Sequence, residues 1–307
     1  MLLSLTVAGA VEASHLFPEH PGACRYHNPV PWVGLVLLLV ALNSKSEVVA
    51  RDDYGHQVRL PAAASRIVSL SPHLTELLYA AGAGARVVGA VEYSDFPAEA
   101  RALPRVGSDA HINLESVLAL RPDLVVAWPN AGSARAVNRL AELRLPVFRS
   151  EPRELEDIAT TLERLGVLAG SAGEAQSAAR AFRGRKAELE KRFAGRAKVR
   201  VFYQVWDRPL LTVNGDHVIS KVIRLCGGEN VFAQAPVIAP EVDREAVLRA
   251  NPDVIITSAA GAEAPAWLSS KRFYVVPAEL IQRHTPRLLD GAEHLCRALD
   301  EVRSARS

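Results

Sequence analysis

The sequence predicts an α/β protein of two lobes, each built around a mostly parallel sheet. Two segments carry this prediction, because residues 113–128 read NLESVLALRPDLVVAW and residues 243–258 read DREAVLRANPDVIITS. Glu, Val, Leu, Pro and Asp coincide, and each segment indicates a short helix, a Pro-Asp turn and a buried strand. Two lobes of similar design leave a cleft where they meet, the usual place for a small ligand. The alternative is that this common α/β connection recurs by chance.

Length and composition fit two globular domains and exclude several other classes of protein. The 307 residues are enough for two domains of about 100–200 residues each. A content of 49% apolar and 23% charged residues is ordinary for a globular chain, and a net charge of +2 is too small to indicate nucleic-acid binding. The sequence has no phosphate-binding P-loop, no paired zinc-finger cysteines and no Gly-x-Ser-x-Gly nucleophile motif. We expect a monomer with no cofactor of its own.

Residues 1–50 differ from the rest of the chain and are predicted to be a leader. The run PWVGLVLLLVALN at 31–43 is too short to span a bilayer comfortably and suits the core of a signal peptide. About thirty residues precede this run, and Arg25 is the clear positive charge among them. A signal peptide usually starts closer to its apolar core, so we favour a start codon assigned too far upstream. Cys24 precedes the run and lacks the apolar neighbour of a lipoprotein signal. We therefore expect a soluble exported protein, with a membrane-anchored protein as the alternative.

Residues 51–150 are predicted to form the N-terminal lobe. Alternation across 52–58 indicates a hairpin, and strand-forming residues follow at 66–70. Ser71 and Pro72 then open a helix as its N-cap and its first helical residue. Further strands are expected at 86–91 and 145–148.

Two helices, predicted at 154–168 and 173–193, separate the lobes, so residues 151–196 are expected to form a helical connection. A helix of about twenty residues is about 30 Å long and stiff. The C-terminal lobe, 197–307, begins with a predicted strand at 199–206 and continues with a turn, a helix and a Gly-Gly pair. The N-terminal lobe has the same order of strand, turn, helix and glycine, which extends the repeat well beyond one short match.

Several motifs resemble those of a known family. RIVSLSP at 66–72, followed by Thr75-Glu76, and YSDFP at 93–97 are similar to the first lobe of periplasmic cobalamin-binding proteins of ABC importers. Further similar motifs are LVVAW at 124–128, LCGGENVF at 225–232 and TPR at 285–287. The resemblance covers residues 64–302. It implies two three-layer α/β lobes joined by one long helix, as in substrate-binding proteins with a helical backbone. It also implies a ligand held in the cleft, delivery to a membrane permease, and no enzymatic activity.

The resemblance further implies a set of ligand-binding residues. Tyr93 and Trp128 fall where the family places aromatic rings against the corrin, and a flat macrocycle gains from such faces. Arg283 falls in the segment that lines the cleft from the C-terminal lobe. Tyr203 and Trp206 follow the first strand of that lobe and are expected to supply substitute aromatic surface. Other cleft tryptophans of the family appear in this sequence as Asp109, Ala239 and Leu280.

Glu115 and Glu245 occupy equivalent positions of the repeat, one in each lobe. They match the positions with which the family engages arginines of the permease, so the resemblance implies a docking role. One exposed carboxylate on each lobe gives two anchors for a two-fold partner. Both residues are also expected in the first turn of a helix, where the helix dipole favours an acid. The two roles are compatible.

Cys226 and Cys296 both lie in the predicted C-terminal lobe of a chain that we expect in an oxidising compartment. A disulfide between them would stabilise the fold by constraining the unfolded chain. Two buried free thiols are the alternative. The resemblance favours the disulfide, and Cys24 would be lost with the leader.

Other ligands and activities remain as alternatives. A haem or a siderophore suits the same superfamily, and related importers bind zinc or manganese through histidines such as His73, His111, His217 and His284. No two of these histidines have the i, i+4 spacing of helical metal ligands, so no metal site is predicted, although His111 could instead contact a corrin. An enzyme of the α/β class finds no support from a Ser/His/Asp set or a carboxylate pair.

Overall fold

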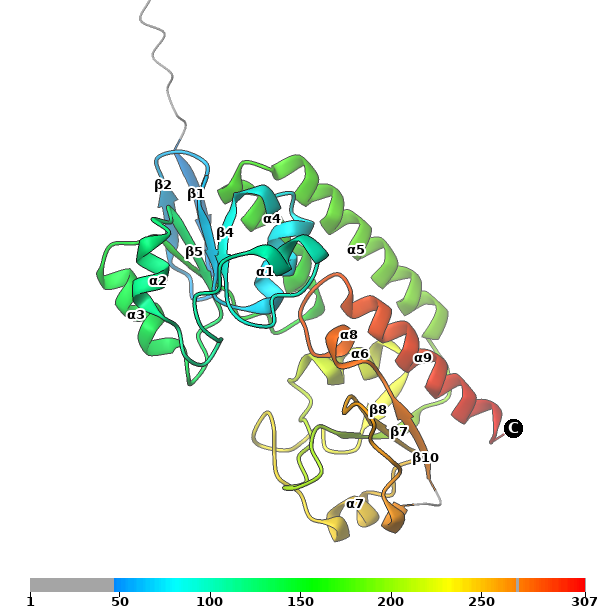
Figure 1. The fold of residues 1–307 in the computed structure, drawn as a ribbon. Helices are drawn as coiled ribbons and strands as arrows, with labels where there is room; N and C mark the ends of the chain where they lie inside the picture. The colour runs from blue at the N-terminus through cyan, green and yellow to red at the C-terminus, as the bar shows by residue number, and fades with distance from the viewer. Residues whose placement is uncertain (1–46, 269–270, 307) are drawn as a thin grey trace, which may run out of the picture. The chain divides into compact units, whose positions relative to one another are not determined.

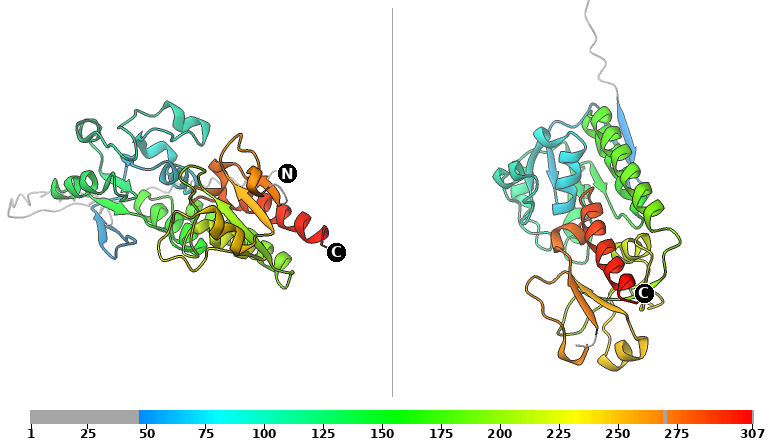
Figure 2. Two further views of the ribbon diagram at one scale, coloured as in Figure 1. Left: turned by 90° about the horizontal axis from the view of Figure 1, so that it is seen from below. Right: turned by 90° about the vertical axis from the view of Figure 1, so that its right-hand side faces the viewer.

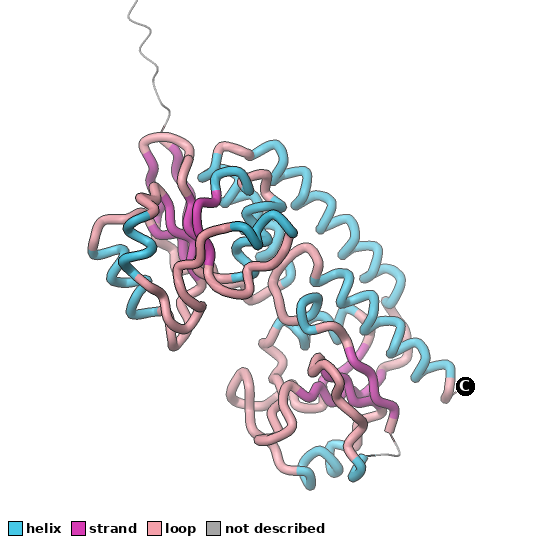
Figure 3. Tube along the Cα trace, in the orientation of Figure 1, coloured by secondary structure: helices cyan, strands magenta, loops and turns pink. Residues whose placement is uncertain are grey.

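The computed structural model describes residues 47–268 and 271–306, which belong to one compact unit. Nearly all of the predicted leader, with its apolar run and Cys24, lies outside the described residues. The described chain contains two four-stranded parallel sheets, one in each lobe, and helices cover both faces of each sheet (Figures 1 and 3). The predicted α/β fold of two lobes with mostly parallel sheets is confirmed.

The sheet of the N-terminal lobe has the strand order β4-β3-β5-β6, and all of its pairs are parallel. Its strands are β3 (Ile67–Ser69), β4 (Val87–Ala90), β5 (Leu124–Ala127) and β6 (Val147–Arg149). Neighbouring residues of a strand face opposite sides, so Ile67 packs in one core and Val68 in the other. The first core holds helices α1 (Pro72–Ala80) and α4 (Leu155–Ala169), and the second holds α2 (Leu114–Ala119) and α3 (Ala134–Glu142).

An antiparallel hairpin precedes this sheet, formed by β1 (Val48–Arg51) and β2 (Gln57–Leu60). The predicted hairpin at 52–58 is therefore present, although most of that segment is its turn. Asp52 closes the turn, because its carboxylate accepts hydrogen bonds from the backbone N–H groups of Tyr54 and His56 at 3.0 and 2.8 Å. Short 3-10 helices follow at Gly84–Arg86 (η1) and Ala98–Ala102 (η2).

The sheet of the C-terminal lobe has the order β10-β9-β7-β8, again with parallel pairs throughout. Its strands are β7 (Val199–Gln204), β8 (Gly228–Asn230), β9 (Val254–Thr257) and β10 (Arg272–Val275). Helices α6 (Val218–Leu225) and α9 (Leu288–Ser304) cover one face. On the other face, α7 (Arg244–Ala250) and the 3-10 helix η3 (Ala266–Leu268) pack on Phe202 and Ile255. A short helix, α8 (Ala278–Ile281), precedes α9.

Helix α5 (Ala172–Phe193) leads from one lobe to the other. It packs against α4 and α1 in the N-terminal lobe and against α6 and α9 in the C-terminal lobe (Figure 2). Helix α4 contacts α1 and β1 as well, which makes it part of the N-terminal lobe as much as of a connection. The division of the chain after residues 50, 150 and 196 stays a prediction.

The sequence repeat corresponds to a repeated hydrogen-bond arrangement. Asp123 accepts hydrogen bonds from the backbone of Ser65 and Arg66 at the start of β3, and the Arg66 guanidinium donates to the carbonyl groups at the end of α2. In the other lobe, Asp253 accepts from the backbone N–H of Arg200 at 2.6 Å, and the Arg200 guanidinium donates to the carbonyl groups at the end of α7. Chance recurrence of a helix–turn–strand connection does not explain the same arginine–aspartate arrangement in both lobes.

The disulfide between Cys226 and Cys296 is present, as predicted. Cys226 follows the last residue of α6, and Cys296 lies on the buried face of α9. The bridge therefore links the two helices that cover the same face of the C-terminal sheet.

We predict that the Cys226→Ala/Cys296→Ala variant loses about 2–4 kcal/mol of unfolding free energy, because the bridge closes a 70-residue loop in the unfolded chain. Urea unfolding of the variant and the wild type measures the difference. A count of free thiols in denatured, unreduced protein should find none at these two positions. Two reactive thiols there, or equal stability of the two proteins, would contradict the prediction.

Candidate functional site

The carboxyl ends of the N-terminal strands face one segment of the C-terminal lobe. Residues that follow β3 and β4 contact residues 283–287, which lie between α8 and α9, and Trp128, which follows β5, contacts His73 after β3. In open α/β sheets this edge is where ligands bind. We call this region the interlobe site and define it by Glu76, Tyr93, Asp95, Trp128 and Arg283.

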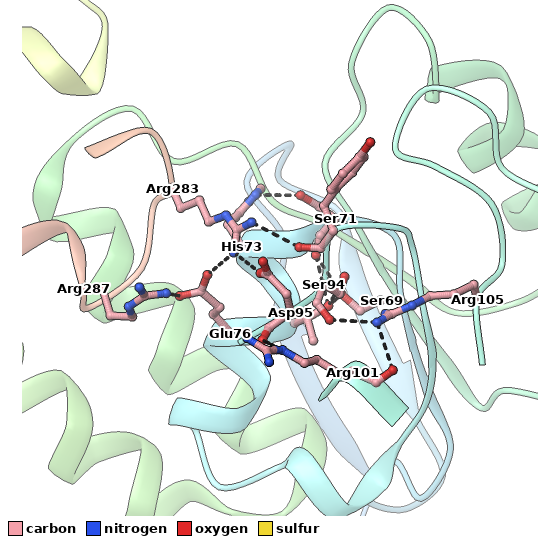
Figure 4. Close-up of polar contacts among 12 residues, drawn as sticks. Ser69, Ser71, His73, Glu76, Ser94, Asp95, Arg101, Arg105, Arg283 and Arg287 are labelled. Carbon is pink, nitrogen blue, oxygen red and sulfur yellow. Dashed lines mark hydrogen bonds and ion pairs between the residues drawn. The ribbon is translucent and has the colours of Figure 1, made fainter. Parts of the chain in front are cut away.

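A buried carboxylate joins the two lobes at this site. Glu76 lies on α1, is 3% exposed, and accepts hydrogen bonds from Arg283 at 2.7 Å and Arg287 at 3.4 Å (Figure 4). Arg283 also donates to Asp95 at 2.8 Å and to the backbone carbonyl of Tyr93 at 3.1 Å. Burial opposes the charge of Asp95, but the hydrogen bond and charge of Arg283, a backbone hydrogen bond and the charge of Arg101 together outweigh it, so the pKa of Asp95 lies below its ordinary value. Two arginines and two carboxylates thus form a charge-balanced cluster.

The backbone around Tyr93 is held in an unusual conformation. Tyr93 has a φ of 62°, in the left-handed region that bulky residues rarely adopt, and its side chain is 75% exposed. Arg105 donates to the carbonyl groups of Val91 and Ser94 at 3.2 and 3.1 Å. Thr75 on α1 donates to the hydroxyl of Ser94 at 3.1 Å. These contacts fix the loop on both sides of Tyr93, so its ring is presented to solvent by an ordered backbone.

Trp128 joins the same site through a pair of histidines. Its half-buried indole lies edge-on to the His73 ring at 5.7 Å, and His73 in turn lies 5.8 Å from the ring of His284. His73 shares a 2.6 Å hydrogen bond with the Ser71 hydroxyl through Nδ1. The buried Nε2 of His73 has no hydrogen-bond partner among the described residues. The structure therefore brings Tyr93, Trp128 and Arg283 together, from segments far apart in the sequence.

Three histidines near this site are held neutral. Burial, together with His284 and Arg283, lowers the pKa of His73 well below its ordinary value. Burial lowers the pKa of His284 to about 4, with His217 adding to the effect. Burial also lowers the pKa of His217 to about 4, and its Nδ1 accepts a hydrogen bond from the backbone N–H of Ile219 as the N-cap of α6.

Two further predicted ligand residues form no hydrogen bond, ion pair or ring contact with these side chains among the described residues. Tyr203 is completely buried, and its hydroxyl donates to Ser258 at 2.8 Å, while burial raises its pKa to about 12. Its ring has no exposed surface for a ligand, which corrects the prediction that Tyr203 contacts the ligand. Trp206 is 58% exposed, and its indole N–H donates to the carbonyl of Arg208. Among the described residues, no hydrogen bond or ring contact links Trp206 to the interlobe site.

Glu76, Asp95 and Arg287 were not predicted as site residues. Glu76 carried one usable signal, because it is an acid on a helix whose other buried residues are largely apolar. Arg287 completes the cluster by stacking on Phe96, with its guanidinium carbon 4.0 Å from the ring centroid. The sequence could not pair Arg283 or Arg287 with Glu76, since more than 200 residues separate each arginine from this glutamate.

Other features of the described chain lie away from this site. A cavity of about 460 Å³ is lined by residues of α4, α5 and α6, among them Lys186, Lys221 and Arg224, and by none of the predicted ligand residues. His111 is exposed in a turn. Across residues 47–268 and 271–306, no group of three or more His, Cys, Asp or Glu side chains is arranged to hold a metal ion. The same residues include no helix with the length and apolar character needed to cross a membrane.

Known proteins with this arrangement identify the family. The model of the periplasmic binding protein family matches residues 67–284. A vitamin B12-binding protein of Vibrio cholerae serotype O1 is 38% identical over 246 residues, which cover 77% of this chain and 89% of the relative. This chain belongs to the periplasmic binding protein family. A vitamin B12-binding protein of Yersinia pseudotuberculosis is 36% identical over 284 residues, covering 89% of this chain and 95% of the relative.

Solved structures agree with this membership. The crystal structure of the periplasmic vitamin B12 binding protein BtuF of Vibrio cholerae matches with a TM-score of 0.73 and 37% identity, covering 78% of this chain and 98% of that chain. The haem-binding protein RhuT from Roseiflexus has a TM-score of 0.68 at 21% identity, covering 78% of this chain and all of that chain, and shares the fold alone. The protein is a periplasmic solute-binding protein and not an enzyme.

The lowered histidine pKa values predict acid destabilisation. His217 titrates near 6.5 when unfolded and near 4 when folded, so the folded state binds fewer protons between these values. The histidine contribution to the unfolding free energy is therefore complete above pH 6.5 and falls as the pH drops towards 4. We expect the unfolding free energy to fall by about 2 kcal/mol for each of His217 and His284 between pH 6.5 and 4, after allowing for rings that are not fully buried.

Urea unfolding between pH 7.5 and 4 measures this loss, and His217→Asn is the control. Asparagine is a good N-cap, so this variant should keep α6 but lose about 2 kcal/mol less than the wild type between pH 6.5 and 4. An identical pH dependence of the two proteins would contradict the assignment to His217.

Proposed function

We propose that this protein is the substrate-binding component of an ABC importer that binds cobalamin or a related corrinoid and delivers it to a membrane permease. The observation that carries this proposal is the 36–38% identity to vitamin B12-binding proteins along nearly their whole length. The haem-binding neighbours, at 18–23% identity, support no choice of ligand.

The interlobe site has chemistry suited to a large flat ligand. Tyr93 offers an exposed aromatic face on an ordered loop, and Trp128 offers a second, half-buried one. Aromatic faces desolvate and orient a macrocycle without net charge. Arg283 is held by Glu76 and Asp95, so its guanidinium is fixed in place before a ligand arrives. Binding at this site is reversible and involves no covalent step.

A direct test mixes purified protein with cyanocobalamin, removes free ligand by desalting and records the visible spectrum of the protein fraction. The proposal expects the red corrin chromophore to travel with the protein in about equimolar amount. Parallel samples with haemin, a ferric siderophore and zinc ions test the alternatives. Retention of one of these ligands in place of cobalamin would overturn the proposal.

For the two aromatic residues, we predict that Trp128→Ala and Tyr93→Ala each weaken cobalamin binding by about 1–3 kcal/mol, because each removes desolvated ring surface. Isothermal titration calorimetry measures the loss. Tyr54→Ala is a matched control, since Tyr54 is an exposed tyrosine in the β1–β2 turn. Unchanged affinity in both site variants would show that the ligand binds elsewhere.

Docking to the permease is assigned to Glu115 and Glu245. Both carboxylates are exposed, and neither forms an ion pair or a hydrogen bond within the described part of the chain. Both glutamates lie in the first turn of their helices, where the dipole favours an acid, while Asn113 and Asp243 supply the N-cap hydrogen bonds by accepting from the backbone N–H groups of Ser116 and Ala246. The carboxylates therefore stay free for a partner. An arginine of the partner would meet each glutamate, and such charge-assisted pairs fix orientation.

We predict that Glu115→Arg/Glu245→Arg abolishes protein-stimulated transport in reconstituted vesicles, with cobalamin affinity and melting temperature nearly unchanged. Wild-type docking should weaken as salt rises, since exposed charges are screened. Glu174→Arg/Glu229→Arg is the control, because it changes the same number of exposed acids, one in α5 and one in β8. Normal transport by the first variant would exclude the docking role. Loss of ligand binding would instead place these residues at the ligand site.

A further inference from the structure

We propose that Leu118 and Leu248 are a matched pair of apolar contacts with the permease, one beside each docking glutamate. This inference rests on the proposed docking role of Glu115 and Glu245. The leucines would add apolar burial to the contact with the permease. Ion pairs at an exposed surface contribute little binding free energy on their own.

The two leucines occupy the same place on equivalent helices. Leu118 lies three residues after Glu115 on α2, and Leu248 lies three residues after Glu245 on α7. Residues three apart lie on the same face of a helix. The leucine side chains are 40% and 52% exposed, so each helix presents a carboxylate and an apolar group next to each other.

The repeat itself indicates that these leucines have a role outside the chain. Of its five shared residue types, Val is fully buried in both lobes and Pro is buried in both. Asp binds the backbone at the start of the neighbouring strand, at Asp123 and at Asp253. Glu lies in the first turn of both helices, where the dipole favours an acid, and Leu is exposed in both lobes with no such role.

The surroundings of the leucines strengthen this point. Other surface positions of the two helices differ, since exposed Ala119 corresponds to exposed Arg249, and half-buried Leu114 corresponds to exposed Arg244. A single exposed leucine needs no explanation. Two at the same repeat position, each beside an unpaired glutamate, indicate one common partner. Figure 1 shows α2 and α7 at the outer side of their own lobes, with each lobe's sheet between the helix and the core of α1, α5 and α9.

The chemistry of this pair defines the partner surface. It must offer a cation next to an apolar pocket, and it must offer this combination twice. Two identical subunits related by a two-fold axis provide such a surface. The periplasmic face of a dimeric permease is therefore the occupant that we assign to α2 and α7. The glutamates guide orientation and association, and the leucines slow dissociation.

Leu118→Ser, Leu248→Ser and the double variant test the proposal. Binding to the purified permease complex of the vitamin B12 importer from the same organism, held in lipid nanodiscs, is measured by biolayer interferometry at two salt concentrations. Each single variant should bind about 5–10-fold more weakly and the double variant at least about 30-fold, mainly through faster dissociation. The salt dependence, the cobalamin affinity and the melting temperature should match the wild type.

Val167→Ser is the matched control, because Val167 is a 40% exposed apolar residue of α4, outside the repeat. It should dock like the wild type. If the leucine variants also dock normally while Glu115→Arg/Glu245→Arg does not, the leucine proposal is wrong and the glutamate role stands.

Two further outcomes would also overturn it. Wild-type protein that fails to bind the permease removes the docking role and the leucine role together, while the cobalamin measurement still decides the ligand. Self-association in sedimentation experiments that both leucine variants abolish would assign these surfaces to a second copy of this chain instead.

Discussion

The pairing of one buried carboxylate determines how the two lobes meet. Glu76 is almost fully enclosed, and a buried charge without a partner costs about 3–5 kcal/mol of stability. Its partners, Arg283 and Arg287, come from the other lobe. The N-terminal lobe can therefore leave the 283–287 segment only by breaking these pairs. Arg283 also donates to Asp95 and to the backbone carbonyl of Tyr93. The position of the aromatic surface therefore depends on the Glu76–Arg283 pair too.

A fixed relation between the lobes matters for both proposed tasks. Helix α5 packs on both lobes and has 22 residues, so it connects them stiffly, and the Glu76 pairs add a second tie. A ligand then meets side chains that are already placed, which lowers the ordering cost of binding. In the proposed docking, the permease would likewise meet two points whose separation is set by the protein. Neither task needs a large closing motion of the kind that flexible strand linkers permit.

The sequence predicted the fold more completely than the site, for a physical reason. The repeat, the helix at 173–193 and the bridge between Cys226 and Cys296 depend on local patterns or on a recognisable family. The Glu76 cluster depends on contacts between residues 207 and 211 positions apart, which no local pattern encodes. Tyr203 was misplaced because β7 is buried on both faces, so alternation along the strand could not indicate which aromatic residue reaches the surface.

A repeat carries two kinds of information once the structure is known. Residues that recur because the fold needs them can be recognised by their contacts, as Asp123 and Asp253 show through the same hydrogen bonds to the backbone. Exposed residues that recur without such contacts point to something that meets both lobes alike. Glu115, Glu245 and the leucines beside them belong to this second group. Each lobe packs its own core, and packing does not require the same residues at exposed positions. The same exposed glutamate and leucine in both lobes are therefore evidence for a shared partner.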